Sequence, residues 1–139
     1  MPRPRLTTST LERELAQDLR RSVLCGELNW GREAVDDGWD KDADVALVLD
    51  GAGDKPVATG RLIRRAGQWC LDLVAVLPKH RRRGLGRELV DFLAAVARQK
   101  GALHILALAS SDAVPFFQAC GFVEGPGDSV VRLLSRKLD

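Results

Sequence analysis

Residues 76–89 read VLPKHRRRGLGREL, and this order of residue types predicts the end of a strand, a basic turn and the start of a helix. Gly84 is a turn former, and Leu85 and Leu89 begin a series of apolar residues at helical spacing. Free N–H groups and the helix dipole attract anions to a helix start, and glycine lets the backbone approach a ligand closely. The stretch therefore predicts a phosphate-binding turn between a strand and a helix.

The motif inside this turn differs from two familiar phosphate-binding motifs. The chain has no G-x-x-x-x-G-K-[ST], and G-x-G-x-x-G would need a glycine where Leu89 stands. What remains is R-x-x-G-x-G, from Arg81 through Gly84 to Gly86. For this pattern taken alone, the alternatives are an ordinary tight turn, a solvated basic face and a nucleic-acid patch.

Length and composition predict one globular domain over residues 1–139. Hydrophobic residues make up 45% of the chain and charged residues 29%, which is a globular composition. No apolar run is long enough to span a bilayer, and none follows the basic N-terminus as in a signal peptide. We therefore expect a soluble, cytoplasmic protein with no membrane partner.

The three cysteines, Cys25, Cys70 and Cys120, are far apart in the sequence and have no His or Cys neighbour at metal-ligand spacing. An odd number of separated cysteines favours neither a disulfide framework nor a zinc site. We expect buried thiols and no metal.

The first half of the chain predicts one helix and three strands. An S-x-x-E capping box at Ser9 opens a helix expected over residues 10–24. Its apolar stripe, at every fourth position, consists of Leu11, Leu15, Leu19 and Val23. Apolar runs separated by turn formers predict strands over residues 44–49, 57–65 and 68–76. Because the connections are short, we expect these strands to form an antiparallel meander.

The second half predicts a helix over residues 85–101, a buried strand over 104–108 and a short helix over 114–120. Two closing strands are expected at residues 122–123 and 130–134, around a GPGD turn. A strand reached through a helical crossover lies parallel to the strand before it. The predicted fold class is therefore α/β, with a mixed sheet.

These features resemble the GCN5-related N-acetyltransferase (GNAT) family, its small bacterial members in particular. In that family a strand ending V-x-P, here Val76 to Pro78, runs into [RQ]-x-x-G-x-[GA] and a long helix. A buried strand, a short helix and a G-F pair follow, here Gly121 and Phe122. The resemblance covers residues 57–122 well and the remainder loosely, and it implies the acyl-CoA N-acyltransferase fold.

The resemblance implies that the chain binds acetyl coenzyme A (acetyl-CoA). Backbone amides from Arg82 to Arg87 would hold the pyrophosphate, and main-chain groups of Val74 to Val76, at a splay in the sheet, would hold the pantetheine and the acetyl carbonyl. The implied cofactor-binding residues are Val74, Ala75, Val76, Arg81, Arg82, Arg83, Gly84, Leu85, Gly86, Arg87, Ser110 and Phe117.

The resemblance also implies direct attack of a neutral amine on the thioester in a ternary complex. Three usual helper residues are missing. Phe117 stands in the place of the tyrosine acid, Ser110 in that of the asparagine and Ile105 in that of the glutamate base, and the chain contains no tyrosine. Catalysis would then depend on proximity, with a water relay moving the protons.

Asp72 and Ser110 are the candidate substitutes for these helpers. Asp72 lies on the strand beside the implied thioester and can act as a base, directly or through water; a plain strand-edge carboxylate is the alternative. Ser110 can donate to the leaving thiolate, or it can cap the next helix. We expect packing and not catalysis for Cys120, a place beside the phosphate or in solvent for His80, and a strand position with local contacts for His104.

The segment 27–44 carries seven acidic side chains against Arg32 and Lys41. In the family this region borders the acceptor pocket. Because carboxylates and exposed aromatic faces attract cations, we expect a small cationic amine as the acceptor. The expected substrate-binding residues are Trp30, Glu33, Asp36 and Asp37. A solvated loop whose tryptophans pack on the core is the alternative.

Two other classes of function remain open. A degenerate module that holds acetyl-CoA as a sensor would explain the missing helper residues. A nucleic-acid module would use the arginine turn together with Arg132, Arg136 and Lys137, but the chain lacks an aromatic stacking pattern. Pairing of the C-terminal strands can also support a homodimer.

Overall fold

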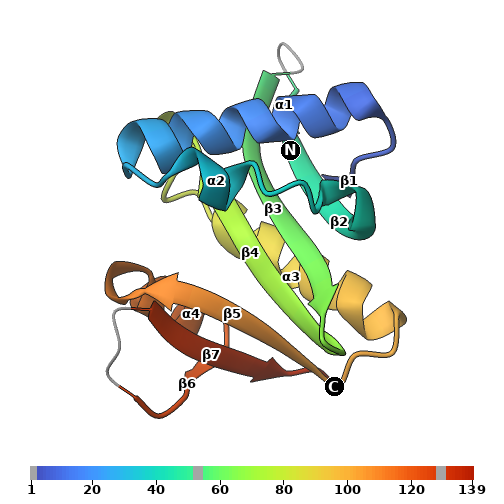
Figure 1. Cartoon of the computed structure of the whole chain (residues 1–139), viewed down its shortest axis with the longest axis vertical. Helices are drawn as coiled ribbons and strands as arrows, with labels where there is room; N and C mark the ends of the chain where they lie inside the picture. Colours follow the sequence, from blue (N-terminus) through green and yellow to red (C-terminus); the bar gives the residue numbers. More distant parts are fainter. Residues whose placement is uncertain (1–2, 52–54, 128–130) are drawn as a thin grey trace.

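The computed structural model describes residues 3–51, 55–127 and 131–139 and shows one seven-stranded mixed sheet (Figure 1). The strands lie in the order β1-β2-β3-β4-β5-β7-β6, and every neighbouring pair is antiparallel except β4 and β5, which are parallel. The strand bounds are Arg5–Leu6 (β1), Ala43–Asp50 (β2), Lys55–Arg65 (β3), Gln68–Val76 (β4), His104–Ser110 (β5), Val123–Glu124 (β6) and Val131–Lys137 (β7).

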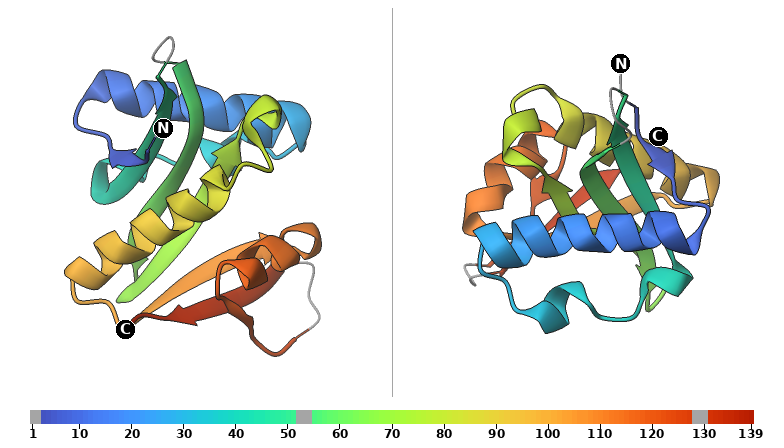
Figure 2. Two further views of the ribbon diagram at one scale, coloured as in Figure 1. Left: turned by 180° about the vertical axis from the view of Figure 1, so that it is seen from behind. Right: turned by 90° about the horizontal axis from the view of Figure 1, so that it is seen from above.

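Helices cover both faces of the sheet. α1 crosses β2, β3 and β4 on one face, whereas α3 packs on β3 and β4 from the other, with α4 beside it on β5, β6 and β7 (Figures 1 and 2). The helices are Thr10–Arg20 (α1), continued by a π-helix at Arg21–Glu27, Arg32–Val35 (α2), Leu85–Gln99 (α3) and Val114–Ala119 (α4). Short 3-10 turns occur at Asp40–Asp42, Pro78–His80 and Ser111–Ala113.

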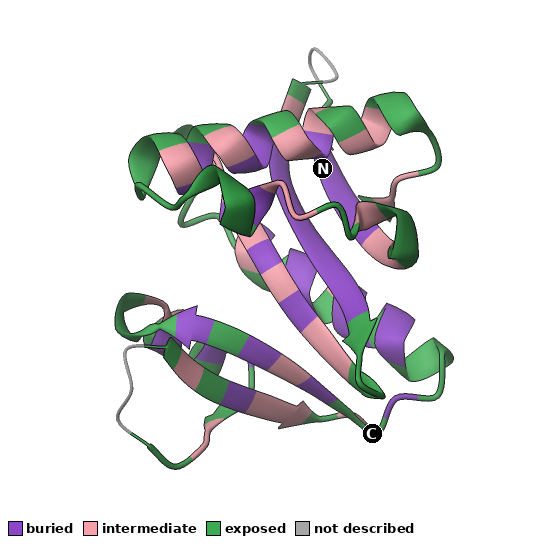
Figure 3. Ribbon diagram, in the orientation of Figure 1, coloured by how far each residue is buried: buried purple, intermediate pink, exposed green. Residues whose placement is uncertain are grey.

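Each face of the sheet has its own apolar core. The larger core lies under α3 and α4 and includes Leu62, Leu71, Leu89, Leu93, Ile105 and Phe122. The core under α1 and the π-helix includes Leu19, Val23, Leu24, Leu73 and Ala75. β3 is buried along most of its length, while β5 alternates between buried and exposed residues (Figure 3). The half of the sheet formed by β5 and β7 is therefore covered on one face only.

The predicted α/β class, antiparallel meander and parallel crossover are confirmed. β4 has the predicted bounds, β5 continues to Ser110, and the first helix continues through the π-helix to Glu27. The sequence did not predict β1, which adds two residues to the edge of β2. Three parts of the predictions lie outside the described residues: residues 52–54 of the turn after β2, Asp128 of the GPGD turn and Val130 of the closing strand.

The start of α1 follows the predicted cap, with one change of partner. The Ser9 hydroxyl accepts a hydrogen bond from the Glu12 N–H at 3.1 Å. The Glu12 carboxylate, however, accepts from the N–H and hydroxyl of Thr8 and not from Ser9. The predicted apolar stripe is also wrong at its first position, because the Leu11 side chain is 66% exposed whereas Leu19 is 5% exposed.

These exposures predict different outcomes for two leucines that the sequence places on one stripe. Leu19→Ala should lower the free energy of unfolding by about 2–5 kcal/mol, because it opens a cavity in the core under α1. Leu11→Ala should change it by less than about 0.5 kcal/mol. Urea unfolding of both variants measures the difference, and similar losses in the two would contradict this packing of α1.

A β-bulge interrupts β4 beside the predicted thioester position. Arg61 of β3 pairs with Asp72, but Thr59 pairs with Ala75, so β4 has one more residue than β3 in this interval. Leu73 takes a left-handed φ of 49°, and the side-chain alternation changes phase there. Asp72 and Leu73 consequently face the same side, toward α1.

The bulge coincides with the point where the two parallel strands separate. β4 and β5 pair only through Cys70 with Leu106 and Leu71 with Ala107. Beyond these pairs the strands diverge into a V, which opens toward the turn that precedes α3 (Figure 1). Main-chain groups of β4 beyond the bulge are therefore left without a neighbouring strand on the β5 side.

Candidate functional site

A groove of about 470 Å³ lies at the open end of this V. One wall is the π-helix, with Leu24 and Leu28, and the floor is the end of β4. The other wall is the basic turn and the start of α3, together with Phe116 of α4. Of the predicted cofactor-binding residues, the groove is lined by Val74, Ala75, Val76, Arg81, Arg82, Gly84, Leu85, Gly86 and Arg87.

Two residues of the basic turn have a left-handed backbone conformation. Arg82 has a φ of 62° and Gly84, the N-cap of α3, a φ of 80°. The Gly84 carbonyl accepts the first helical hydrogen bond from the Glu88 N–H at 2.9 Å. The N–H groups of the first turn of α3 consequently have no acceptor within the helix, and they point toward the groove end where an anion can bind.

The two glycines of the motif have different physical roles. A Cβ at Gly84 would meet open space, so glycine is favoured there by its φ and not by crowding. A Cβ at Gly86 would lie 3.0 Å from the Phe116 ring. Gly86 therefore allows the close approach of α4 to α3, a packing role that the motif alone did not indicate.

Arg81 holds the turn in place. Its Nε donates to the Val76 carbonyl at 2.9 Å, and its two terminal nitrogens donate to the Glu27 carboxylate at 2.6 Å. The hydrogen bonds with Arg81 lower the pKa of Glu27, and the same contact raises the pKa of Arg81. The guanidinium thus ties the π-helix, β4 and the turn together, and it has few donors left for a ligand.

The remaining arginines of the turn carry uncompensated charge. Arg82, Arg83 and Arg87 are exposed, and within residues 3–51, 55–127 and 131–139 none of them forms an ion pair. His80 also lines the groove. Positive charge and free backbone N–H groups therefore converge at one end of it, as a phosphate-bearing ligand requires.

A second, smaller cavity of about 160 Å³ adjoins the groove. The two share Leu24, Leu28, Val74 and Phe116 as lining residues. This cavity brings together four residues that the sequence singled out separately, namely Trp30, Asp72, Ser110 and Phe117. The Ser110 side chain does not cap the turn that follows it, whereas Phe117 is buried edge-to-face against Phe116 and Phe122.

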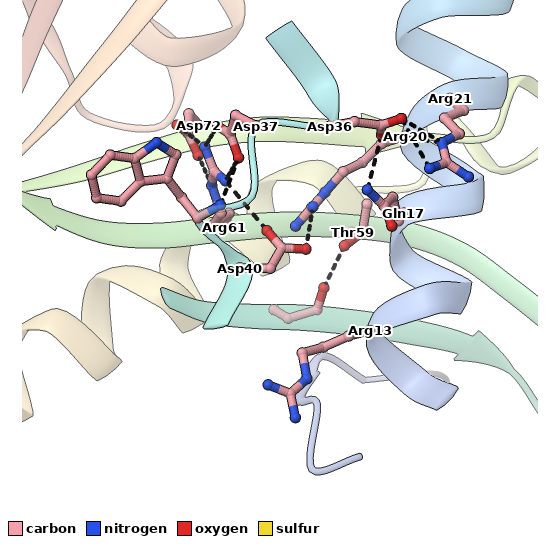
Figure 4. A network of polar contacts seen from close by, with 12 residues as sticks. Arg13, Gln17, Arg20, Arg21, Asp36, Asp37, Asp40, Thr59, Arg61 and Asp72 are labelled. Atoms are coloured by element: carbon pink, nitrogen blue, oxygen red, sulfur yellow. Dashed lines mark hydrogen bonds and ion pairs between the residues drawn. The ribbon is translucent and has the colours of Figure 1, made fainter. Parts of the chain in front are cut away.

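A buried arginine, which the sequence reading did not identify, lies behind this cavity. The Arg61 side chain is 1% exposed and forms paired hydrogen bonds of 2.8 Å with both carboxylate oxygens of Asp72 and both of Asp37 (Figure 4). Asp40 contacts it at 3.3 Å and also pairs with the buried Arg20 at 2.7 Å. These charges link the sheet and α1 to residues 27–44, the acidic segment.

The network favours the charged forms of Arg61 and Asp37. Burial lowers the pKa of Arg61, but the hydrogen bonds with Asp72 and Asp37 outweigh burial and raise it overall. The Arg61 hydrogen bonds in turn lower the pKa of Asp37. The only sequence signal for this arginine is its place in VATGRLI, a stretch of β3 in which it is the one charged residue.

The acidic segment is therefore much less available to a cation than its composition predicted. Asp37 is paired with Arg61, and Asp36 accepts hydrogen bonds from Arg21, Arg32 and Gln17, which lower its pKa. Asp36 lies beside Arg21 and Gln17 (Figure 4), and it does not line the cavity. Glu33 and Asp37 border a shallower polar hollow that includes Asp72.

The other candidate residues lie in different surroundings. The carboxylate of Asp72, expected as a base, faces the cavity but is held by Arg61. Cys120 is buried, which raises the pKa of its thiol, and it lines neither the groove nor the cavity. His104 lies at the opposite end of β5 from Ser110. Arg83 does not line the groove, although it neighbours residues that do.

Solved structures share this fold across the whole chain. A proposed N-acetyltransferase from Lactobacillus plantarum superposes with a TM-score of 0.86 over 99% of this chain and 98% of its own, at 24% identity. A proposed streptothricin acetyltransferase from Bacillus anthracis, in complex with acetyl coenzyme A, matches 70% of this chain and 64% of its own with a TM-score of 0.63 and 18% identity. The fold is that of acyl-CoA N-acyltransferases.

Sequence comparison gives the family. YjcF of Bacillus subtilis, an uncharacterized N-acetyltransferase, is 31% identical over 104 residues, which are 75% of this chain and 73% of YjcF. The profile of the acetyltransferase (GNAT) family matches residues 13–122. The chain belongs to this family and is an acyltransferase enzyme.

No helix in the described part of the chain combines the length and the apolarity needed to cross a membrane. No group of three His, Cys, Asp or Glu side chains in this part of the chain is placed to hold a metal ion.

The buried network leads to a prediction about stability. Arg61→Ala should lower the free energy of unfolding by about 3–5 kcal/mol, because it leaves Asp37 and Asp72 without their partner. Arg64→Ala, on the same strand, is the matched control: Arg64 is exposed and stacks on Trp69 at 5.5 Å, so its loss should cost about 1 kcal/mol or less. Guanidinium unfolding compares them, and equal losses would show that Arg61 is not the organising charge.

Proposed function

We propose that the chain transfers an acetyl group from acetyl-CoA to a primary amine. The observation that carries the proposal is the junction of the two cavities at the bulge of β4, where one cavity has an anion-binding end and the other holds polar candidate groups. Acetyl-CoA supplies an activated thioester carbonyl. The acetyl-CoA complex of the Bacillus anthracis structure supports this choice of donor.

The residues of the groove fit the donor. Backbone N–H groups from Arg82 to Arg87 would hold the pyrophosphate, and the side chains of Arg82, Arg83 and Arg87 would offset its charge. The pantetheine would lie along Val74 to Val76, where β4 has no strand beside it. Because the Val76 carbonyl already accepts from Arg81, we assign the pantetheine contacts to the main chain nearer the bulge.

Ser110 and Asp72 are the groups that we propose for proton handling. Ser110 lines the cavity, and its hydroxyl would donate to the thiolate as it forms. Each Asp72 oxygen accepts one hydrogen bond from Arg61 and keeps a lone pair that can orient a water near the amine. Proximity of the two substrates supplies the remainder of the rate enhancement.

The buried Phe117 favours a second candidate function. Where the family has a tyrosine acid, this side chain has no polar atom and packs between Phe116 and Phe122. A chain that binds acetyl-CoA and releases it unchanged, as a sensor, is consistent with this substitution. The cationic acceptor that the acidic segment suggested is not retained in this proposal, because arginines pair with Asp36 and Asp37, two of its expected contacts.

Release of free thiol separates the two functions. With acetyl-CoA and a broad panel of primary amines, the enzyme should release coenzyme A with at least one amine at roughly tenfold or more above the rate without amine. Mass spectrometry should detect the matching acetylated amine. Saturable acetyl-CoA binding in calorimetry, with thiol release at the hydrolysis background for every amine, would indicate the sensor.

The turn before α3 provides a test of donor binding. Gly84→Asp should weaken acetyl-CoA binding about tenfold or more, because it places a negative charge at the N-terminus of α3. Gly84→Asn is the matched control, since asparagine also tolerates the left-handed φ of 80° but adds no charge. Arg83→Ala should weaken binding by less than Gly84→Asp does. Calorimetry measures all three, and a larger effect of Arg83→Ala would overturn the backbone-cradle interpretation.

A further inference from the structure

We infer that the acceptor amine carries an apolar group about the size of a six-membered ring, which binds in the cavity beside the groove. The inference rests on the proposed acetyl transfer and specifies its acceptor. It replaces the small cationic acceptor that composition alone favoured.

The lining of the cavity is the first argument. Its walls come from the π-helix, β4, β5 and α4, and they are apolar apart from Asp72 and Ser110. Leu108, whose side chain is 59% exposed, and Trp30, 40% exposed, lie at its rim, and the buried Phe117 lines its interior. A group placed there loses contact with water on most sides, which favours an apolar one.

The size of the cavity is the second argument. Its volume is about 160 Å³. Apolar protein cavities of roughly 150 Å³ bind benzene, so a phenyl ring or a branched alkyl group of similar volume fits this space. A long polyamine or an aminoglycoside exceeds it. The four residues shared with the groove place such a group directly beside the donor.

The charges around the cavity are the third argument. Asp72, the one carboxylate in its lining, forms a paired contact with the buried Arg61. Asp37, on the far side of that guanidinium, is paired in the same way. Arg65 lies 3.5 Å from Asp37 and 3.9 Å from Asp72, so two guanidinium groups face these two carboxylates. The local charge is therefore balanced within the fold, and it supplies no excess attraction for a second or third positive charge on an acceptor.

The chemical step with such an acceptor balances without a further reactant. The lone pair of the neutral amine forms an N–C bond with the thioester carbonyl carbon, and the C–S bond breaks. The nitrogen loses one proton, and the departing sulfur of coenzyme A gains one. Only the amine nitrogen needs to reach the junction near Val74, while the apolar group remains in the cavity.

A comparison of four amines tests the inference with the unmodified enzyme. Thiol release from acetyl-CoA is measured with 2-phenylethylamine, isopentylamine, ethanolamine and spermidine. The kcat/KM values for the two apolar amines should exceed those for ethanolamine and spermidine by roughly 10- to 100-fold, the discrimination that a hydrophobic pocket provides. Equal values, or a preference for spermidine, would overturn the inference.

Substitutions at two leucines on the same exposed face of the sheet test whether the acceptor binds in this cavity. Leu108 and Leu133 are direct neighbours across β5 and β7, but only Leu108 lines the cavity. Leu108→Asn should lower kcat/KM for 2-phenylethylamine about tenfold, and by more than it lowers the value for ethanolamine. Leu133→Asn, at a side chain that is 49% exposed, should change neither value. Equal effects of the two variants would remove the cavity as the acceptor site.

The outcomes distinguish failure of this inference from failure of the proposed function. If no amine releases thiol while acetyl-CoA still binds, the proposed transfer is wrong and the inference falls with it. If amines are acetylated without preference for the apolar ones, the transfer stands and this inference alone is wrong. Acetyl-CoA binding to Leu108→Asn, measured by calorimetry, should equal that of the unmodified protein and serves as the check on folding.

Discussion

The buried guanidinium of Arg61 is the group that holds the segment after the π-helix on the sheet. A cation buried to this extent is costly unless carboxylates surround it, and Asp72 of β4 and Asp37 of the acidic segment supply them. The segment after the π-helix contributes little apolar surface, with Val35 as its buried hydrophobic residue. It is therefore held on the sheet mainly by charge, and the same pairing removes those carboxylates from substrate attraction.

The bulge in β4 connects this network to the site. The extra residue shifts the alternation of side chains along β4, so Asp72 and Leu73 both face α1. Asp72 joins the charged network there, and Leu73 joins the apolar core. The same irregularity ends the pairing with β5 and leaves main-chain groups open at the head of the groove. A single local departure from strand geometry thus provides the anchor, the opening between the strands and the junction of the two cavities.

Periodicity and turn formers predicted most of the elements, because apolar spacing decides which face of a helix or strand is buried. The R-x-x-G-x-G turn likewise predicted the groove. Neither pattern could reveal Arg61, since an arginine in a strand usually lies on a solvated face, nor the bulge at Leu73, which no glycine or proline of β4 itself marks. Counting charge in the acidic segment does not give the availability of each carboxylate, because that availability depends on partners far away in the sequence.

Phe116 limits how the substrate specificity of such an enzyme can evolve. Its ring lines both cavities and also lies against Gly86, so one side chain forms part of the groove, the adjoining cavity and the α3–α4 contact. A smaller residue there would enlarge the adjoining cavity and at the same time loosen the start of α3. In the enzyme that we propose, acceptor range and donor affinity would therefore change together at this position, and new specificities would be more accessible through rim residues such as Leu108.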